Sequence, residues 1–358
     1  MIETYTYTLP FTTPFKTGKS IFKNREGVIV RYTDDVDILT EAAPLPGFSG
    51  ETLDDVKTFF SGYSDSISRF FDSNFSIDEI SPFLSSLPGL SSAQFALSMM
   101  ALLILAERKN CTIDELLQIR SVPDSVLVNT VVGLGSEEAV LSQIELASKQ
   151  GFGTIKLKVS NSPAELAAVL RKASEKYPDI TFRLDANQSW SADTALEQIA
   201  YFKDLPVEYI EEPAAVSSPD ELEKIISNSP LPVALDESIT NLKSLEFALK
   251  SYPDTVIIIK PTLFGNFIQL AETISQYRSS FQQIVVTTAL EAAVGRAMVN
   301  EVAFLIGDRK LAHGLNTGNM LAKDLFDDVR ILNGKLSKAE RVVNKLQFNK
   351  LNQALLTS

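Results

Sequence analysis

The stretch TIKLKVS, residues 154–160, shows the pattern that decides the fold: a short apolar run that ends in charged residues. The pattern returns about once every 25 residues, in FRLDAN (182–187), VEYIEEP (207–213), VALDES (233–238) and VIIIKP (256–261). Short runs rich in Val, Ile and Leu are typical of strands that are buried on both faces. Each intervening segment has room for one crossover helix, so the repeat predicts a parallel barrel with charged strand ends gathered at one mouth.

The strand-like runs are numerous enough to close a barrel rather than to build an open sheet. They lie at residues 126–132, 154–159, 181–185, 207–211, 232–236, 255–260, 283–287 and 310–314. Helical patterns such as SPAELAAVLRKASEKY (162–177) and SADTALEQIAYFKDL (191–205) separate them. The catalytic barrel is therefore predicted to span residues 121–320.

Residues 1–120 show a different pattern and are predicted to form a separate α+β unit. Apolar and polar residues alternate up to about residue 35, which is typical of antiparallel strands with one solvated face. The polar segment 16–27 predicts a loop that closes over a bound ligand, and residues 52–119 show a mostly helical pattern that begins at an N-cap, Thr52. The polar tail, residues 321–358, is expected to pack back on this unit.

Composition excludes several classes of protein. The net charge of −12 disfavours nucleic-acid binding, and no apolar stretch is long enough for a membrane span. His313 is the only histidine, which excludes a multi-histidine zinc site and leaves proton transfer mainly to Lys, Asp, Glu or Tyr. The chain starts without an export pattern, and Cys111 has no second cysteine to pair with, so we expect a cytoplasmic protein.

Three carboxylates end consecutive predicted strands. Asp185, Glu211 and Asp236 would lie within a few ångströms of one another on adjacent barrel strands, which is unfavourable unless a cation lies between them. All-oxygen ligands suit a hard ion, so Mg²⁺ is the predicted cofactor, with Mn²⁺ as a substitute. Taken alone, any one of these acids is better explained as the N-cap of the helix that follows it. All three together, in register with lysines, favour the metal site.

Lysines complete the predicted mouth. Lys156 and Lys158 are two apart on one strand and share a face, while apolar neighbours point the other way. The proximity of Lys156 is expected to lower the pKa of Lys158 and prepare it as a general base. Lys260, across the barrel, is either a second acid/base group or a stabilising cation. Asn187 is expected beside Asp185 as a hydrogen-bonding group.

Other charged residues are assigned supporting roles. Arg183 shares a face with the acid two residues later and is predicted to pair with a carboxylate. Glu212 is turned away from the ion by strand alternation, and Glu237 is interpreted in the same way. His313 is interpreted as structural rather than catalytic.

Taken together, these motifs resemble those of the enolase superfamily. The Lys-x-Lys, Asp-x-Asn, Glu-Glu-Pro, Asp-Glu-Ser and Lys-Pro motifs, in this order, are similar to those of the muconate lactonizing enzyme subgroup. The resemblance covers nearly the whole chain and implies α/β architecture: a modified (β/α)8 TIM barrel of (β/α)7β type with an N-terminal α+β capping domain. It implies Asp185, Glu211 and Asp236 as metal ligands, Lys158 as the base and Lys260 as the opposing lysine.

Within the subgroup, three stretches resemble the o-succinylbenzoate synthase family: EAAPLPGFSGET (41–52), VVTTALEAAVGR (285–296) and HGLNTG (313–318). This resemblance implies a carbon–oxygen lyase of menaquinone biosynthesis. It would take 2-succinyl-6-hydroxy-2,4-cyclohexadiene-1-carboxylate to 2-succinylbenzoate by α-proton abstraction and a metal-stabilised enediolate. The substrate is thus a small-molecule carboxylate, and Thr288, Asn316, Thr317 and Gly318 are expected near it.

Alternatives remain open at the level of sequence. Dipeptide epimerases, N-acylamino acid racemases and cycloisomerases use the same scaffold. Dipeptide epimerases often carry an Asp-x-Asp motif after the eighth strand, whereas this chain has Gly314, Leu315 and Asn316 there. A binding protein that lost the chemistry is a further alternative, disfavoured because both lysines and all three acids are retained. Homo-oligomer formation is left open.

Overall fold

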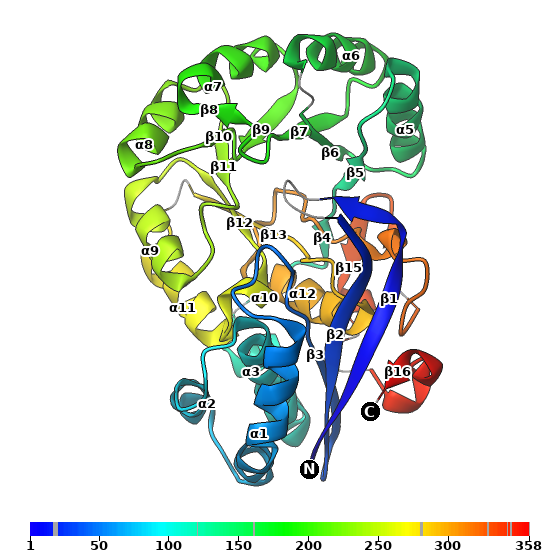
Figure 1. Ribbon diagram of the computed structural model, residues 1–358, viewed down its shortest axis with the longest axis vertical. Coiled ribbons are helices and arrows are strands. Elements are labelled where there is room, and N and C mark those ends of the chain that lie inside the picture. Colours follow the sequence, from blue (N-terminus) through cyan, green and yellow to red (C-terminus); the bar gives the residue numbers. More distant parts are fainter. Residues whose placement is uncertain are drawn as a thin grey trace.

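A computed structural model describes residues 1–16, 21–119, 121–159, 162–279, 282–327, 329–341, 343 and 346–357. It places an antiparallel sheet with helices, drawn in blue and cyan in Figure 1, beside a curved parallel sheet ringed by helices, drawn in green to orange. The strand order in the curved sheet is β13-β12-β11-β9-β7-β6-β5, and neighbouring strands pair in parallel. The chain therefore has the predicted α/β class, a modified TIM barrel with an N-terminal α+β cap.

The cap is built on a β-meander. β1 pairs antiparallel with β2, and β2 with β3, as predicted. The expected solvated face is missing from the centre of the sheet, where Val28, Ile29 and Val30 are all buried and β3 is buried from Ile38 to Ala42. Thr52 caps the first helix in a capping box with Asp55, as the sequence predicted. The cap elements are β1 (Ile2–Lys16), β2 (Ile21–Thr33), β3 (Asp37–Ala42), α1 (Leu53–Asp72), α2 (Ile77–Ser85), α3 (Ser91–Lys109) and α4 (Ile113–Leu116).

The prediction of a loop over residues 16–27 was wrong for most of its length. β2 begins at Ile21, and its backbone pairs with β1 as far as Lys16 and Ile21. Polar side chains suggested a loop, but a two-stranded ribbon is held by backbone hydrogen bonds and tolerates solvated side chains on its exposed faces. Residues 17–20, the rest of the predicted closing loop, lie outside the described residues.

The barrel strands follow the predicted runs closely. The runs near 154–159, 181–185 and 207–211 become β6 (Thr154–Lys158), β7 (Thr181–Asp185) and β9 (Val207–Glu211). The next three become β11 (Val233–Leu235), β12 (Val256–Ile259) and β13 (Gln283–Val286). Side chains from β9, β11, β12 and β13, with Leu311 from the eighth run, form a separate apolar cluster inside the barrel: Tyr209, Ala234, Val256, Ile258, Val285 and Leu311.

The first and eighth predicted strands differ from expectation. The run 126–132 is divided into β4 (Ser125–Leu127) and β5 (Thr130–Val132), and β4 pairs antiparallel with a C-terminal strand. The run 310–314 appears as isolated parallel bridges, His313 to Val128 and Gly314 to Thr287. These bridges join β13 to the start of the sheet and close the barrel.

Helices surround the barrel in the order in which they follow the strands. Their apolar faces pack on the outer side of the sheet. They are α5 (Glu137–Lys149), α6 (Pro163–Lys176), α7 (Ala192–Ile199), α8 (Pro219–Asn228), α9 (Leu242–Ser251), α10 (Pro261–Phe264), α11 (Phe267–Tyr277) and α12 (Ala293–Ile306). A short parallel pair, β8 (Trp190–Ser191) with β10 (Ala214–Ala215), lies beyond β7 and β9.

The C-terminal tail contacts both units. β14 (Ile331–Leu332) and β15 (Lys335–Ser337) form a hairpin that pairs with β4. β16 (Leu356–Thr357) pairs antiparallel with β1, so the end of the described chain adds a strand to the cap sheet (Figure 1). Within the ranges given above, no helix is long and apolar enough to cross a membrane.

Candidate active site

The charged ends of neighbouring barrel strands lie in one row. Lys158 on β6 is the register partner of Asp185 on β7, and Asp185 is the partner of Glu211 on β9. β11 continues the row, because its Ala234 pairs with Glu211 and Asp236 follows its last residue. These positions are at the carboxyl end of the parallel sheet, where barrel enzymes carry their reactive groups.

Two of the predicted lysines contact these carboxylates. Lys156 Nζ lies 3.0 Å from Asp185 Oδ2 and 2.7 Å from Glu211 Oε2, so one ammonium group bridges two acids. Lys260 Nζ forms an ion pair with Asp236 Oδ2 and donates a hydrogen bond to it. The structure therefore gathers Asp185 and Glu211 around one positive charge and places Asp236 against another.

Lys158 differs from the other two lysines. On β6 the lysines are half-buried while Ile155 and Leu157 are buried, which confirms the alternation expected for this strand. Among the described residues no carboxylate lies within ion-pair distance of Lys158 Nζ, in contrast to Lys156. Lys158 thus presents an amine at the mouth that is available to a bound molecule.

The charges at the mouth perturb one another strongly. Burial raises the pKa of Glu211; Lys156 opposes the rise, Asp185 and Asp236 add to it, and the result is about 8. Burial alone would lower the pKa of Lys156, but the carboxylates of Asp185 and Glu211 outweigh it and hold this pKa well above its usual value. Burial likewise acts to lower the pKa of Lys260, but the carboxylate of Asp236 raises it above its usual value.

The donor chemistry of the mouth fits a hard divalent cation. Carboxylate oxygens are the ligands that Mg²⁺ prefers, and Mn²⁺ accepts the same set. Glu211 Oε2 is buried and accepts no hydrogen bond from the described residues, although Lys156 Nζ is near it. In the described part of the chain, however, no three His, Cys, Asp or Glu side chains are already arranged as a metal cage. Asp185 and Glu211 share the ammonium group of Lys156, and Asp236 contacts that of Lys260, so the convergence of all three acids on one ion stays a prediction.

Two strained turns hold the carboxylates at the mouth. Asn187 and Glu212 have φ angles of 44° and 42°, which non-glycine residues seldom adopt. The Asn187 backbone N–H donates to Asp185 Oδ1 at 3.2 Å, and its Nδ2 donates to Glu237 Oε1 at 2.9 Å. Glu212 is buried and accepts a 2.8 Å hydrogen bond from the backbone N–H of Asp236. Asn187 thus lies beside Asp185, and Glu212 holds the turn that carries Asp236.

Arg183 lies deeper in the barrel than the mouth. Its Nε donates to Glu208 Oε2 at 2.6 Å, and its Nη1 donates to Asn129 Oδ1 at 3.2 Å and to the Ala312 carbonyl at 2.5 Å. The guanidinium carbon also lies 4.7 Å from the centroid of the Tyr209 ring. Arg183 therefore pairs with an acid, and it is one strand layer below the row of carboxylates.

The loops that follow the seventh and eighth runs lie together. Thr288 Oγ1 and Thr317 Oγ1 are 2.8 Å apart and share a hydrogen bond. Asn316 Nδ2 donates to Thr130 Oγ1 at 3.2 Å, and Gly318 begins a 3₁₀ turn, Gly318–Met320. Contact between these residues and a substrate stays a prediction.

His313 occupies the barrel wall. It is fully buried, and its Nδ1 accepts a 3.1 Å hydrogen bond from the backbone N–H of Val286. Burial, supported by the nearby Arg183 charge, lowers the pKa of His313 to about 4. These surroundings agree with a structural histidine that stays neutral.

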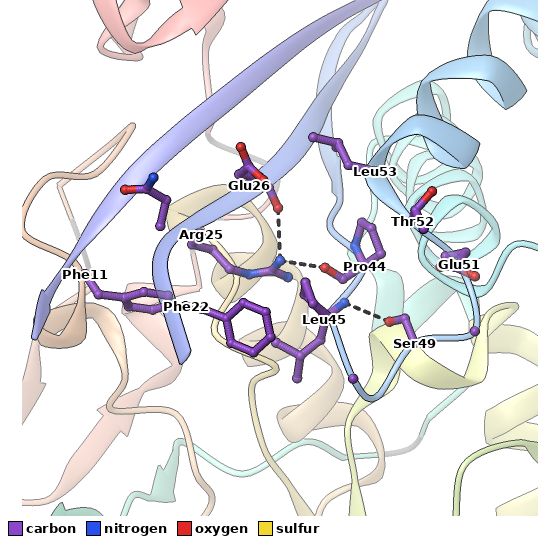
Figure 2. A pocket seen from close by; sticks show the side chains of 14 residues that line it. Phe11, Phe22, Arg25, Glu26, Pro44, Leu45, Ser49, Glu51, Thr52 and Leu53 are labelled. Carbon is purple, nitrogen blue, oxygen red and sulfur yellow. Dashed lines mark hydrogen bonds between the residues drawn. The ribbon is translucent and has the colours of Figure 1, made fainter. Parts of the chain in front are cut away.

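A cavity of about 340 Å³ lies in the cap, between β1, β2 and the loop after β3 (Figure 2). Phe48 in that loop connects the cavity wall to the barrel, since its ring centroid lies 5.0 Å from Lys260 Nζ. The sequence reasoning assigned no role to Phe48 or to Arg25, which lines the cavity. The sequence feature that could have identified Phe48 is its position inside a Pro- and Gly-rich turn, where a large apolar side chain is unusual.

Comparison with known proteins agrees with this geometry. Residues 139–336, more than half of the 358 residues, match the family described as enolase C-terminal domain-like, and residues 1–104 match the MenC N-terminal domain. The chain is similar to o-succinylbenzoate synthase of Haemophilus influenzae, with 26% identity over 84% of each chain. It is also similar to an L-amino acid-D/L-Glu epimerase of Sulfurimonas denitrificans, with 24% identity over 49% of this chain and 52% of that one.

Among solved structures, the fold is similar to that of muconate lactonizing enzyme from Pseudomonas fluorescens complexed with muconolactone. The TM-score is 0.80 at 17% identity, and the alignment covers 96% of this chain and 97% of the other. At this identity the likeness concerns the fold alone. The match of the barrel sequence, the cap over it and the shared architecture lead to one assignment: the chain belongs to the enolase superfamily and is an enzyme of that scaffold.

Proposed function

We propose that this protein is an o-succinylbenzoate synthase. It would dehydrate 2-succinyl-6-hydroxy-2,4-cyclohexadiene-1-carboxylate to 2-succinylbenzoate in menaquinone biosynthesis, as a carbon–oxygen lyase. The observation that carries the proposal is the placement of Lys158 in register with Asp185 and Glu211, with no carboxylate partner of its own in the described residues. The MenC-type cap and the relative named o-succinylbenzoate synthase support the choice of substrate.

The chain's own residues would carry the proton transfers. Lys158 Nζ takes the proton α to the ring carboxylate, and the electron pair of that C–H bond moves toward the carboxylate. The resulting Lys158 ammonium then gives its proton to the hydroxyl that leaves from the same face, so that water departs and the ring becomes aromatic. Lys260, held by Asp236, stabilises negative charge from the opposite side of the mouth.

A magnesium ion completes the proposal. Asp185, Glu211 and Asp236 would hold it, and the bound ion would supply charge stabilisation for the developing carboxylate dianion. Lys156 and Lys260 contact these acids, so a bound ion would share the carboxylates with these ammonium groups or displace them.

The direct test is conversion of the cyclohexadiene substrate by the purified chain with MgCl₂. Formation of 2-succinylbenzoate with a kcat above about 1 s⁻¹, a typical enzymatic rate, is the expected result. No product from the folded, Mg²⁺-saturated protein would reject the assignment. Two variants test whether turnover occurs at the mouth. Lys158→Ala should be inactive, whereas Lys172→Ala should stay active because Lys172 pairs with Glu137 on the surface.

A second candidate is a dipeptide epimerase or an N-acylamino acid racemase; cycloisomerase chemistry uses the same scaffold. The favouring observations are the relative named L-amino acid-D/L-Glu epimerase and the presence of Lys260 as an opposing amine. In such an enzyme Lys260 would deliver a proton to the face opposite Lys158. Incorporation of deuterium at the α-carbon of a dipeptide or an N-acylamino acid in D₂O, without dehydration of the cyclohexadiene, would select this alternative.

We also propose which partners the protein binds and where in the cell it works. The substrate is a small carboxylate, nucleic acid is no partner of so acidic a chain, and the protein works in the cytoplasm. Analytical ultracentrifugation would decide between a monomer and a homo-oligomer, and fractionation of producing cells would test the location.

A further inference from the structure

Arg25 is an unusual residue of the cap because its charged group is buried and forms no ion pair with a carboxylate in the described part of the chain. The side chain is 2% exposed, although it belongs to β2 and lines the cavity in the cap. Within the described ranges no carboxylate lies at ion-pair distance from it. A buried guanidinium is costly unless its donors are satisfied, so the contacts of Arg25 need a reason.

The donors of Arg25 are satisfied by backbone carbonyl groups. Nη1 donates to the carbonyl oxygens of Glu26 at 2.9 Å and Pro44 at 2.6 Å, and Nη2 donates to Ala43 at 2.7 Å. Nε donates to the carbonyl of Leu290, in the barrel loop after β13, at 3.1 Å. Figure 2 shows the side chain of Arg25 reaching from β2 toward Pro44. One rigid fork therefore joins β2, the loop after β3 and the barrel.

The barrel end of this connection leads to Lys260. Leu290 has a left-handed φ of 63°, a strained conformation for leucine, and its carbonyl accepts from Arg25. The next residue, Glu291, is buried and accepts hydrogen bonds from the Ala289 backbone N–H at 2.7 Å and from Thr262 Oγ1 at 2.5 Å. Thr262 is two residues after Lys260, so the loop held by Arg25 also holds the segment that carries this lysine.

The cap end of the connection leads to the same lysine. The loop Ala43–Gly50 begins at the carbonyl groups that Arg25 binds, and the Leu45 backbone N–H donates to Ser49 Oγ at 2.8 Å within it. Phe48 in this loop lies over Lys260 Nζ at 5.0 Å. Arg25 therefore fixes the cavity wall and the lysine segment relative to each other from both sides.

We propose that Arg25 is a positioning residue that locks the cap loop 43–50 onto the barrel loop at Leu290 and thereby sets the place of the cap cavity above Lys260. The inference rests on the proposed function, since it assumes that a substrate spans from the mouth into this cavity. Lys158 and the carboxylates belong to the barrel strands and do not contact Arg25. Loss of the lock therefore displaces substrate contacts made by the cap more than it disturbs the proton-transfer groups.

The test compares Arg25→Lys with Arg31→Lys. Arg31 is also on β2, but it pairs with Glu3 and Asp37 and lies over the ring of Phe348, away from the mouth. Arg25→Lys is expected to raise KM about tenfold or more with kcat changed less than about fivefold, because cap contacts to a non-reacting part of the substrate bind the ground state and the transition state alike. Arg31→Lys is expected to leave both values at those of the wild type.

A second readout needs no substrate. Amide hydrogen exchange of residues 45–50 is expected to become at least about tenfold faster in Arg25→Lys and to stay unchanged in Arg31→Lys. Unchanged exchange in Arg25→Lys, or faster exchange with an unchanged KM, overturns the inference. A third outcome separates the two proposals. If exchange is faster in Arg25→Lys but the wild type does not convert the cyclohexadiene substrate, the proposed function is rejected while the lock itself is supported.

If Arg25→Lys fails to fold, Ser49→Ala tests the same loop. This variant removes the acceptor of the Leu45 N–H inside the loop and leaves the buried guanidinium intact. The same rise in KM and faster exchange are expected, smaller in size. A normal KM with a loosened loop in Ser49→Ala overturns the inference.

Discussion

Lys156 reaches across β7 to contact Glu211. Its Nζ lies 2.7 Å from Glu211 Oε2 and 2.8 Å from Oε1, and on the way it lies 3.0 Å from Asp185 Oδ2. The ammonium group thus occupies the space between two carboxylates that would otherwise repel each other. The same space suits a divalent cation, so the lysine and the ion compete for the same oxygens.

Removal of this competitor should strengthen metal binding. We expect Lys156→Met to bind Mg²⁺ about tenfold more tightly than the wild type, because two acids then face each other without a counter-charge. Isothermal titration with MgCl₂ measures the change. Lys172→Met, which removes a surface lysine paired with Glu137, is the matched control. Weaker Mg²⁺ binding in Lys156→Met would show that the ammonium supports the ion site.

Lys158 is the residue on which turnover should depend most. Lys158→Ala is expected to lower kcat by about 10²- to 10⁴-fold, the usual contribution of a positioned general base. Circular dichroism should be unchanged, because Lys158 has no ion-pair partner in the described chain to lose. Lys176→Ala, at a surface lysine paired with Glu145, should retain full activity. Activity of Lys158→Ala within tenfold of the wild type would remove the base assignment.

Asp236 should matter for metal binding. Asp236→Asn removes one negative charge from the mouth and is expected to weaken Mg²⁺ binding by about 10- to 100-fold. The comparison is Asp254→Asn, since Asp254 is an exposed acid outside the mouth. Thermal-shift titration with MgCl₂ would report the difference, and identical curves for the two variants would exclude Asp236 as a ligand.

The barrel was predictable because its strands are buried on both faces. An apolar run such as residues 256–259, which is Val-Ile-Ile-Ile, has no solvated face, so its composition alone identifies it as a buried strand. The alternation of Lys156 and Lys158 with buried Ile155 and Leu157 likewise follows from local sequence. What was missed depends on partners far along the chain. The first predicted run is divided because β4 pairs with β15, a strand about 200 residues later.

The lysine contacts and the cap network were also beyond the sequence. The positions of Asp185 and Glu211 at the ends of their strands predict that the two acids are close. They do not predict that the Lys156 ammonium group lies between them. Arg25 lies between Asn24 and Glu26, and Glu41 follows Thr40, so neither position gives a sign of its partners. Arg25 binds the carbonyl of Leu290, and Glu41 accepts from the Gly295 backbone N–H at 2.7 Å. Such contacts follow only from the docking of the cap on the barrel.

Tyr7 should stabilise the contact between cap and barrel. Its hydroxyl donates a 2.6 Å hydrogen bond to the buried carboxylate of Glu41, which in turn accepts from backbone N–H groups at the start of α12. Tyr7→Phe is therefore expected to lower the free energy of unfolding by about 1–3 kcal/mol. Tyr5→Phe is the control on the same strand, since the Tyr5 hydroxyl is only part-buried and bonds to Glu3 at 3.1 Å. Equal losses in urea unfolding would contradict a special role for Tyr7.

His313 should make the protein less stable in acid. Burial lowers its folded pKa to about 4, below the ordinary value of 6.5, so between these values the unfolded chain binds a proton that the folded chain does not. The contribution of His313 is therefore fully present above about pH 6.5 and falls as the pH drops toward 4, by roughly 3 kcal/mol in total.

His313→Asn isolates this contribution. The amide oxygen of asparagine can accept the hydrogen bond that Val286 N–H donates to Nδ1 at 3.1 Å, while the amide carries no titrating proton. Urea unfolding of both proteins at several pH values between 7 and 4.5 measures the free energy of unfolding. The variant is expected to start lower, because the ring leaves a cavity, and to lose less stability per pH unit than the wild type. Parallel curves for the two proteins would mean that His313 is protonated in the fold as readily as in the unfolded chain.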